Sequence, residues 1–438
     1  MDPDFKWGVS TAAYQIEGGH DAHGKGLSIW DVFTAKGSCH ERHHGNTACD
    51  FYNRYKDDVA LINELNIPNF RFSLSWSRII PNGIGEVNPE GIAYYNRLID
   101  ECLANGIEPW ITLYHWDLPH ELELKGGWAN REIVDWFAEY VRVCAEAFGD
   151  RVKYWMVMNE PMVFTGAGYF MGIHAPGRRG LGNFLPAVHH AVLAMAEGGR
   201  VLKALLPEAE VGTTFSGSYI QPKTDSPKDI IAAQRVDALL NRLFIEPLLG
   251  FGYPEADLPV LKKIRKHFKE GDEAKMVFTF DFIGIQNYTR EVVKHSVITP
   301  YVNAVLVDAK KRQVPLTAMG WEVYPPAIYQ MIKKFNEYDG ITKIYITENG
   351  AAFPDTMVDG KVIDTERMAY IQNHLKQVKK AKDEGLEVSG YFVWTLTDNF
   401  EWNEGYRPKF GLIHVDFETQ QRTVKASGKW YGKFLGGD

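Results

Sequence analysis

The sequence predicts an α/β fold, a parallel barrel of eight strands with helices between them. Two observations predict it: short apolar runs alternate with longer amphipathic segments along the 438 residues, and eight such runs are present. Each run is almost continuously apolar, as expected for parallel strands that are buried on both faces. The predicted strands are Lys6–Ser10, Asn69–Ser73, Pro109–Tyr114, Tyr154–Met158, Glu210–Phe215, Phe282–Tyr288, Lys343–Thr347 and Gly390–Leu396.

The segments between these runs have the periodicity of amphipathic helices. In Tyr55–Leu65, for instance, Val59, Ile62 and Leu65 fall on one stripe. The competing architecture, an open doubly wound sheet, usually carries a glycine-rich phosphate-binding turn after its first strand, and none follows Ser10. The other predicted helices are Asn88–Leu103, Arg131–Phe148, Pro186–Leu205, Asp229–Leu248, Pro326–Tyr338 and Thr365–Glu384.

The length leaves the number of domains open. At roughly 150 residues per domain the chain would form two or three, but barrels of this type often exceed that size as one unit. No low-complexity linker divides the sequence. We therefore predict one catalytic domain over residues 1–438, a single (β/α)8 TIM barrel with elaborated loops between strands and helices.

The composition argues against several classes of protein. The chain has 48 basic and 56 acidic residues, a formal charge of −8, whereas a nucleic-acid-binding protein needs a basic face. Its apolar stretches are far shorter than the roughly 20 residues that cross a bilayer, and no signal-peptide pattern begins the sequence. The four cysteines form no Cys-x-x-Cys pair, so no zinc ribbon or disulfide framework is indicated. We expect a cytoplasmic protein that binds neither nucleic acid nor membranes; a homo-oligomer is compatible with these observations.

Polar and aromatic side chains gather where the predicted strands end. In a barrel of this kind the chemistry takes place at the carboxyl ends of the strands. A solvated turn explains any single polar position, but surface turns use lysine freely, and lysine is nearly absent here. The residues concerned are Gln15, Glu17, Arg71, His115, Trp116, Asn159, Glu160, Gln286, Asn287, Tyr288, Glu348, Asn349, Trp394, Asp398, Glu401 and Trp402.

Two carboxylates stand out among these residues. Glu160 follows the fourth predicted strand and Glu348 the seventh, so both would face the same mouth of the barrel. Such a pair can flank a glycosidic bond: a separation of roughly 5–5.5 Å supports a retaining mechanism and about 6.5–9.5 Å an inverting one. Their neighbours are Trp, Tyr and Asn rather than a third acid, which disfavours a metal site. We predict no metal and no cofactor.

A series of motifs carries these residues in a fixed order along almost the whole chain. They are Tyr14–Gly18, Arg71–Ile79, Tyr114–Pro119, Asn159–Pro161, His174–Gly177, Ile346–Gly350, Asp398–Trp402 and Phe410–Leu412. Together they closely resemble glycoside hydrolase family 1, the β-glucosidase family. The resemblance implies a retaining β-glycosidase on a TIM barrel.

The resemblance also implies a role for each site residue. Glu160 would be the general acid/base, with a raised pKa, and Glu348 the nucleophile, with a pKa that Arg71 keeps low. Arg71 and Tyr288 would hold the nucleophile. The substrate-binding residues would be Gln15, His115, Trp116, Asn159, Gln286, Trp321, Trp394, Glu401, Trp402 and Phe410, with Trp394 beneath the cleaved sugar and Trp321 under the leaving group.

Three positions depart from the family pattern. Gln286 stands where Asn is usual, so the hydrogen bond expected there would come from a longer side chain. Met162 often is Trp and His120 often is Gln in the family. We expect both to lie on the outer side of the site and to affect leaving-group preference.

These observations together predict an exo-β-glycosidase, a β-glucosidase that hydrolyses terminal non-reducing β-D-glucosyl residues by double displacement. We expect some β-galactosidase and β-fucosidase activity, with small β-glucosides and cello-oligosaccharides as substrates. Glu401 argues against a phospho-β-glycosidase, because a carboxylate would repel a sugar phosphate. The alternatives are a mainly transglycosylating β-glycosidase and a non-catalytic sugar-binding relative.

Overall fold

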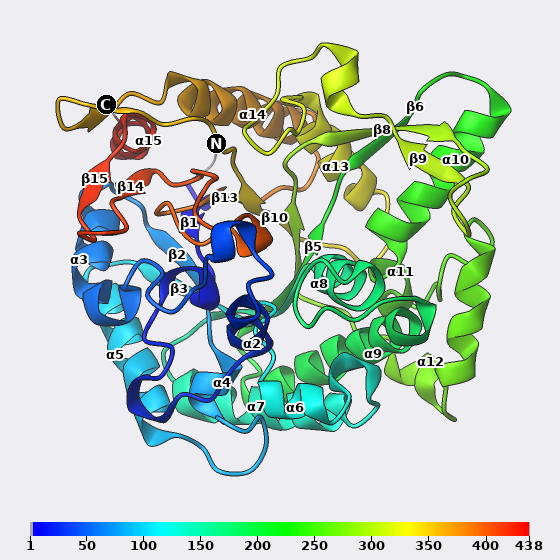
Figure 1. The fold of residues 1–438 in the computed structure, drawn as a ribbon, viewed down its shortest axis with the longest axis horizontal. Helices are drawn as coiled ribbons and strands as arrows, with labels where there is room; N and C mark the ends of the chain where they lie inside the picture. Colours follow the sequence, from blue (N-terminus) through cyan, green and yellow to red (C-terminus); the bar gives the residue numbers. More distant parts are fainter. Residues whose placement is uncertain (1–2, 438) are drawn as a thin grey trace.

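The computed structural model describes residues 3–437, and these contain a closed barrel of eight parallel strands (Figure 1). The barrel strands are β1 (Lys6–Ser10), β2 (Asn69–Ser73), β3 (Glu108–Tyr114), β4 (Tyr154–Asn159), β5 (Glu210–Ser216), β7 (Phe282–Gln286), β10 (Ile344–Asn349) and β13 (Gly390–Trp394). They follow one another in chain order, and β1 pairs with both β2 and β13, which closes the barrel. The predicted (β/α)8 barrel is confirmed.

Two barrel strands end earlier than the apolar pattern predicted. β7 ends at Gln286 rather than Tyr288, and β13 ends at Trp394 rather than Leu396. Apolar residues can follow a strand without belonging to it, because side chains beyond the last paired residue can pack against other groups. The pairings of β7 stop at Gln286, which is opposite Ser216 of β5 and Glu348 of β10. Tyr288 therefore lies beyond the strand, and its hydroxyl donates to Glu348 at 2.6 Å.

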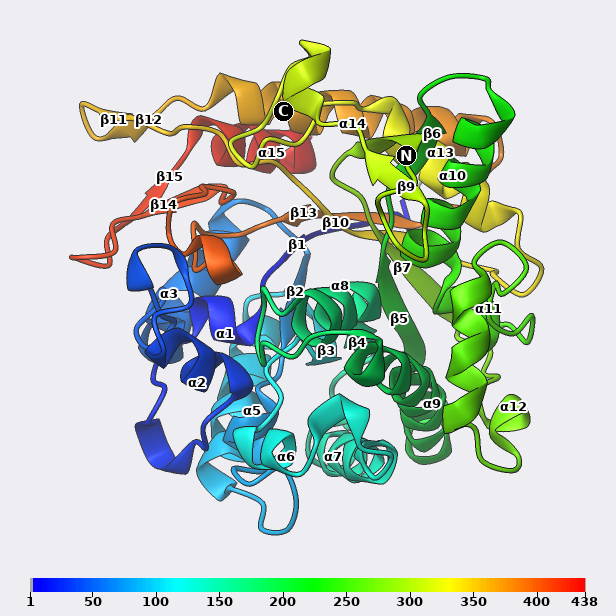
Figure 2. The same ribbon diagram turned by 45° about the vertical axis from the view of Figure 1, so that its right-hand side comes forward.

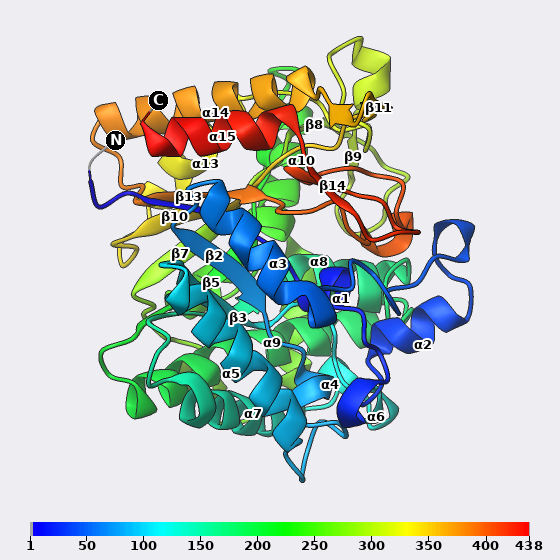
Figure 3. The same cartoon turned by 90° about the vertical axis from the view of Figure 1, so that its left-hand side faces the viewer.

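Helices surround the barrel in the order of the chain, and Figures 1 and 3 show them as an outer ring. Among the described residues, no helix is long and apolar enough to cross a membrane. The principal helices are α3 (Phe51–Glu64), α5 (Pro89–Ala104), α7 (Ile133–Phe148), α9 (Leu181–Leu205), α10 (Pro227–Asp237), α11 (Ile245–Leu248), α13 (Pro326–Asn336), α14 (Thr365–Asp383) and α15 (Ala426–Gly436).

Three helices differ from their predicted extent by four residues or more. α3 begins at Phe51 rather than at Tyr55. The helix predicted over Asp229–Leu248 is interrupted, because α10 passes into a π-helical turn at Ala238–Arg242 before α11 begins. The helix predicted to begin at Pro186 begins at Leu181, so this proline lies inside α9. Proline is most common in the first turn of a helix, which is why the sequence placed the start too late.

An aromatic cluster fills the amino-terminal half of the barrel. Trp110 stacks on Tyr154 with ring centroids 3.8 Å apart, and Tyr345 and Phe392 pack edge-on against it. All four come from the first three residues of their strands. This cluster fills one end of the barrel. A site for chemistry is therefore expected at the other end, which the carboxyl termini of the strands form.

The loops at that open end contain additional strands. β6 (Tyr219–Pro222) pairs in parallel with β8 (Arg290–His295), which pairs with β9 (Ala304–Leu306). Figure 2 shows this small sheet beside α10, outside the barrel. A hairpin of β14 (Ile413–Val415) and β15 (Arg422–Val424) follows the last barrel strand. These additions fit the prediction of elaborated loops, although the sequence did not locate them.

We expect Trp110→Ala to lower the free energy of unfolding by about 3–5 kcal/mol, the range for truncating a buried tryptophan. The substitution leaves a cavity under Tyr154 and removes the indole N–H that donates to Asn69 Oδ1 at 2.9 Å. Denaturant unfolding followed by fluorescence would measure it. Phe251→Ala, at a side chain that is 61% exposed, is the control and should change stability by less than about 0.5 kcal/mol. A loss below about 1.5 kcal/mol for Trp110→Ala would show that this cluster is not a tightly packed core.

Candidate active site

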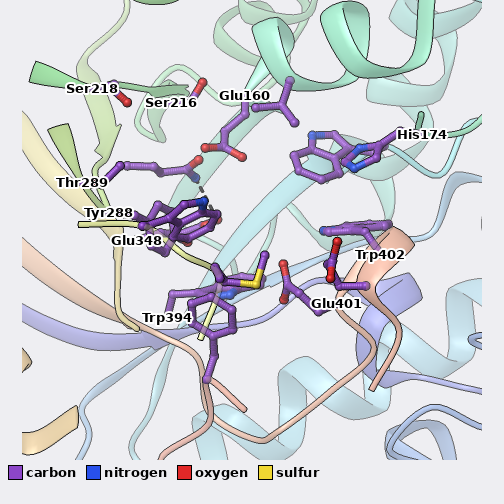
Figure 4. A pocket seen from close by; sticks show the side chains of 18 of the residues that line it. Glu160, His174, Ser216, Ser218, Tyr288, Thr289, Glu348, Trp394, Glu401 and Trp402 are labelled. Carbon is purple, nitrogen blue, oxygen red and sulfur yellow. Dashed lines mark hydrogen bonds between the residues drawn. The ribbon is translucent and has the colours of Figure 1, made fainter. Parts of the chain in front are cut away.

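A cavity of about 390 Å³ lies at the carboxyl ends of the barrel strands. In Figure 4, Glu348 and Tyr288 lie on the left of it and Trp402 and His174 on the right, with Glu160 above and between them. Arg71, Asn159 and Gln15 lie behind this lining and contact it through hydrogen bonds. The predicted site residues that line the cavity are His115, Trp116, Glu160, Gln286, Tyr288, Trp321, Glu348, Trp394, Glu401, Trp402 and Phe410.

Three donors hold the carboxylate of Glu348, which lies near the end of β10. Arg71 Nη1 and Gln286 Nε2 donate to Oε1, the latter at 2.8 Å, and the Tyr288 hydroxyl donates to Oε2 at 2.6 Å. The side chain is 3% exposed. The carboxylate is therefore fixed in position, and Gln286 reaches it as the longer side chain was expected to.

Arg71 links Glu348 to the neighbouring strands. Its guanidinium is fully buried. It donates to Asn159 Oδ1 through Nη2, and to Thr112 Oγ1 through Nε at 3.1 Å. The Asn159 amide in turn donates to His115 Nε2 at 3.0 Å. Burial and the Arg71 charge lower the pKa of His115 well below its usual value, so its ring is neutral and can accept this bond.

Glu160 stands in a different environment. It follows β4 directly and adopts a left-handed backbone conformation with φ of 44°, which costs about 1–3 kcal/mol in a residue other than glycine. Its side chain makes no hydrogen bond or ion pair within residues 3–437. The strained backbone therefore directs an unpartnered carboxyl group into the cavity.

The pKa values of the two glutamates are shifted unequally. Burial, followed by the charge of Glu348, raises the pKa of Glu160 well above its usual value. Burial also raises the pKa of Glu348, while Arg71 and the Tyr288 hydroxyl oppose the rise. The prediction of a low pKa for Glu348 is wrong because desolvation outweighs the arginine. The predicted order is retained, with Glu160 the harder of the two to ionise.

A third carboxyl group, that of Glu401, also lines the cavity. Gln15 Nε2 donates to Glu401 Oε2 at 3.3 Å and to the Phe400 carbonyl at 2.9 Å. Burial and the Glu348 charge raise the pKa of Glu401 to about 8, with the Gln15 hydrogen bond opposing them. Glu401 is thus positioned to exchange hydrogen bonds with sugar hydroxyls, as donor or as acceptor.

Aromatic rings cover the cavity wall beside this carboxyl group. Trp116 and Trp402 lie with ring centroids 4.6 Å apart, and His115 stacks between Trp402 and Trp394 at 5.9 and 6.0 Å. Trp116 and Trp402 both have left-handed backbones, with φ of 77° and 50°. Flat apolar faces next to fixed polar groups suit a sugar ring, whose C–H faces are apolar and whose edge carries hydroxyls.

Comparison with known proteins identifies the family. The model of glycosyl hydrolase family 1 matches residues 1–436. The chain belongs to glycosyl hydrolase family 1. It is an O-glycosyl hydrolase, and the resemblance seen in its motifs is confirmed.

Named relatives of this glycosyl hydrolase agree with that assignment. Beta-glucosidase A of Thermotoga maritima is 44% identical over 434 residues, which cover 98% of this chain and 96% of the relative. The 1,4-beta-D-glucan glucohydrolase of Thermotoga neapolitana is 42% identical, with coverage of 98% and 97%. A solved structure of the family 1 β-glucosidase from Thermotoga maritima superposes with a TM-score of 0.96 at 43% identity, covering 100% of this chain and 98% of that one.

Several residues of the glycosyl hydrolase cavity had no role in the sequence-based prediction. His174 begins the His174–Gly177 motif, but nothing in that motif indicates a contact with the cavity. The others follow β4, β5, β7 or β13 along the chain or, like Ser216, end a strand, and no local pattern distinguishes a lining residue from a surface one there. They are Val163, Ser216, Gly217, Ser218, Thr289, Glu291, Met319, Asn403 and Glu404.

Two departures from the family pattern lie outside the cavity lining, and their expected effect on leaving-group preference stays a prediction. Neither Met162 nor His120 is among the described residues that line the cavity, whereas Val163 is. Within residues 3–437, no group of three or more His, Cys, Asp or Glu side chains could hold a metal ion. The described residues that line the glycosyl hydrolase cavity supply carboxyl, amide, hydroxyl, imidazole and indole groups.

We expect Tyr288→Phe to lower kcat/KM of the glycosyl hydrolase by about 10–100-fold, the effect of losing one hydrogen bond to a charged group. Since the Tyr288 hydroxyl lowers the pKa of Glu348, its loss raises that pKa. The acidic limb of the pH–rate profile, which we expect to follow the ionisation of Glu348, should move to higher pH. Tyr431→Phe, whose hydroxyl donates to the distant Gly8 carbonyl, should leave the profile in place. An unshifted acidic limb in Tyr288→Phe would contradict the role given to this hydroxyl.

Proposed function

We propose that this chain is a retaining exo-β-glucosidase that releases terminal non-reducing β-D-glucosyl residues by double displacement. The observation that carries the proposal is the unequal treatment of two glutamates in one cavity. Glu348 is held by three donors, whereas Glu160 has none and is the harder to ionise. A fixed carboxylate suits a nucleophile, and a carboxyl group that stays protonated suits a general acid.

In the first step, Glu348 would attack the anomeric carbon while Glu160 donates its proton to the leaving-group oxygen. Arg71, Gln286 and Tyr288 orient the attacking carboxylate. The bond from the anomeric carbon to the leaving group breaks, and an ester to Glu348 forms. Asn159, fixed between Arg71 and His115, supports a hydrogen bond to the sugar that strengthens in the oxocarbenium-like transition state.

In the second step, water would replace the leaving group. Once Glu348 is an ester, it no longer carries the charge that raises the pKa of Glu160. Glu160 can then ionise more readily and accept a proton from the water that attacks the anomeric carbon. The sugar leaves with its original configuration, and both glutamates return to their starting states.

The charge of the cavity favours neutral sugars. None of the described residues that line it is Lys or Arg, and five are glutamates. A 6-phosphorylated sugar would bring two negative charges into this surrounding without a cation to pair with them. A relative at 36% identity is named 6-phospho-beta-galactosidase of Clostridium acetobutylicum, and we propose that the acidic lining of the present cavity disfavours phosphorylated sugars.

Relatives support glucosides as the main substrates and galactosides as further ones. Beta-glucosidase of Agrobacterium is 38% identical over 99% of this chain, and the Thermotoga maritima β-glucosidase has been solved with galacto-hydroximolactam. We propose small β-glucosides and cello-oligosaccharides as substrates, with some activity on β-galactosides and β-fucosides.

We expect Glu348→Gln to reduce turnover of 4-nitrophenyl β-glucoside by at least about 10⁴-fold, because no covalent ester can form. Steady-state release of nitrophenol would measure it. Circular dichroism and thermal unfolding would check that the fold is intact, and Glu418→Gln, at an exposed glutamate, is the matched control. Substantial turnover by folded Glu348→Gln would refute the assignment of the nucleophile.

We expect Glu160→Ala to slow cellobiose hydrolysis by about 10²–10⁴-fold, the usual contribution of a general acid. Substrates with a good leaving group, such as 2,4-dinitrophenyl β-glucoside, need less protonation and should lose less in the glycosylation step. Added azide should restore part of the rate and yield β-glucosyl azide, because it attacks the ester without a base. An unchanged rate on cellobiose would overturn the acid/base role of Glu160.

A further inference from the structure

One carboxyl group of the cavity has no part in the chemistry described above. Glu291 lies on β8, in the small sheet outside the barrel, and lines the same cavity as Glu160 and Trp321. Although Glu291 is half-buried, its side chain makes no hydrogen bond or ion pair with any described residue. The protein thus presents an uncommitted carboxyl group to whatever occupies this side of the cavity.

The neighbouring arginines form their ion pairs with Glu322 and not with Glu291. Arg290 donates twice to Glu322, and Arg312 donates to the same carboxylate at 2.6 Å. Arg290 also lies over the Tyr324 ring at 3.7 Å. Both guanidinium groups are therefore engaged by Glu322, and Glu291 receives only the longer-range attraction of Arg312 and the repulsion of Glu322.

Uncommitted hydroxyl groups lie along the same wall. The side chains of Ser216 and Ser218 have no hydrogen bond among the residues described, whereas the Thr289 hydroxyl donates to the Glu322 carbonyl at 2.9 Å. Figure 4 shows these three residues together on the side of Glu348, opposite Trp402 and His174. Trp321 adds a flat aromatic face that lies 5.4 Å from the Tyr288 ring. This wall therefore combines one apolar face with several free polar groups.

We propose that Glu291 accepts hydrogen bonds from the hydroxyls of a sugar leaving group and makes the enzyme favour glucosides of sugars over glucosides of alkyl alcohols. The proposal rests on the proposed function and assigns a preference at the leaving-group side of that site. Hydroxyl groups are the complementary donors for an unpaired carboxylate, and hydrogen bonds to charged groups are stronger than those between neutral groups. An alkyl chain offers no donor and would desolvate the carboxylate without compensation.

Glu291 differs from an ordinary surface carboxylate in its pKa. Burial raises the pKa of Glu291 to about 7, with Arg312 opposing the rise and Glu322 adding to it. This raised pKa gives the preference a pH dependence. Because the ionised form is the better acceptor, selectivity for a sugar leaving group should increase as pH rises through 7.

The test compares kcat/KM for cellobiose with kcat/KM for hexyl β-glucoside in the same enzyme. Both leaving groups are poor and both need Glu160, so the ratio cancels the common chemistry. The variants are Glu291→Gln, which keeps the shape and removes the charge, and Glu291→Leu, which removes all hydrogen bonding. Glu418→Gln is the control for a change of net charge at an exposed site.

We expect the cellobiose-to-hexyl-glucoside ratio to fall by about 10–100-fold in Glu291→Leu and by a smaller factor in Glu291→Gln, with no change in Glu418→Gln. The rise of the ratio through pH 7 should disappear in Glu291→Gln. If Glu291→Leu does not fold, the isosteric glutamine variant decides. A ratio within threefold of the wild type in folded variants overturns this proposal alone. A wild-type enzyme that cleaves neither glucoside overturns the proposed function, and this proposal with it.

Discussion

The buried contact between Arg71 and Glu348 is the interaction on which the site depends. A guanidinium at 0% exposure must be paired, since removing one partner of a buried ion pair typically costs about 3–5 kcal/mol. Arg71 meets this requirement with Glu348 and with the amide oxygen of Asn159. One charge therefore fixes groups from β2, β4 and β10, which lie on different sides of the barrel. The same contact makes the two glutamates unequal, because Arg71 bonds to Glu348 and leaves Glu160 without a partner.

A second buried charge network holds the loop after β13. Lys425 donates to Asp398 and Asp355 at 2.6 and 2.5 Å, and Arg367 binds Asp355 at 3.0 Å. Burial by itself would raise the pKa of Asp398, but Lys425 and His414 lower it below the ordinary value, so this aspartate stays charged. Asp398 Oδ1 also accepts the Gly411 N–H at 2.9 Å. The network thus holds Asp398, three residues before Glu401, with charged groups that are not part of the cavity lining.

The cavity divides into two parts with different constraints. Near Glu348, hydrogen bonds join its carboxylate to Arg71 and Gln286, and join both of these side chains to Asn159, which suits a site that must hold one sugar in one orientation. Towards Trp321, the wall is lined by groups without a hydrogen-bond partner among the described residues, namely Ser216, Ser218 and Glu291. Ser216 is the last residue of β5, whereas Ser218 and Glu291 lie outside the barrel. Loops tolerate change better than barrel strands, so this part can vary in preference while the chemistry is retained.

The sequence by itself determined the barrel, its strands and the position of the two glutamates. Strands buried on both faces need apolar residues throughout, and the polar residues at their carboxyl ends then stand out against that background. Only the tertiary structure decided what those residues do to one another. It showed that Gln286 binds Glu348, that desolvation outweighs Arg71 in setting the pKa of Glu348, and that Glu291 faces the cavity. The physical reason is that apolar patterning is a local property of the chain. Hydrogen bonds, burial and charge interactions depend instead on distances between residues hundreds of positions apart.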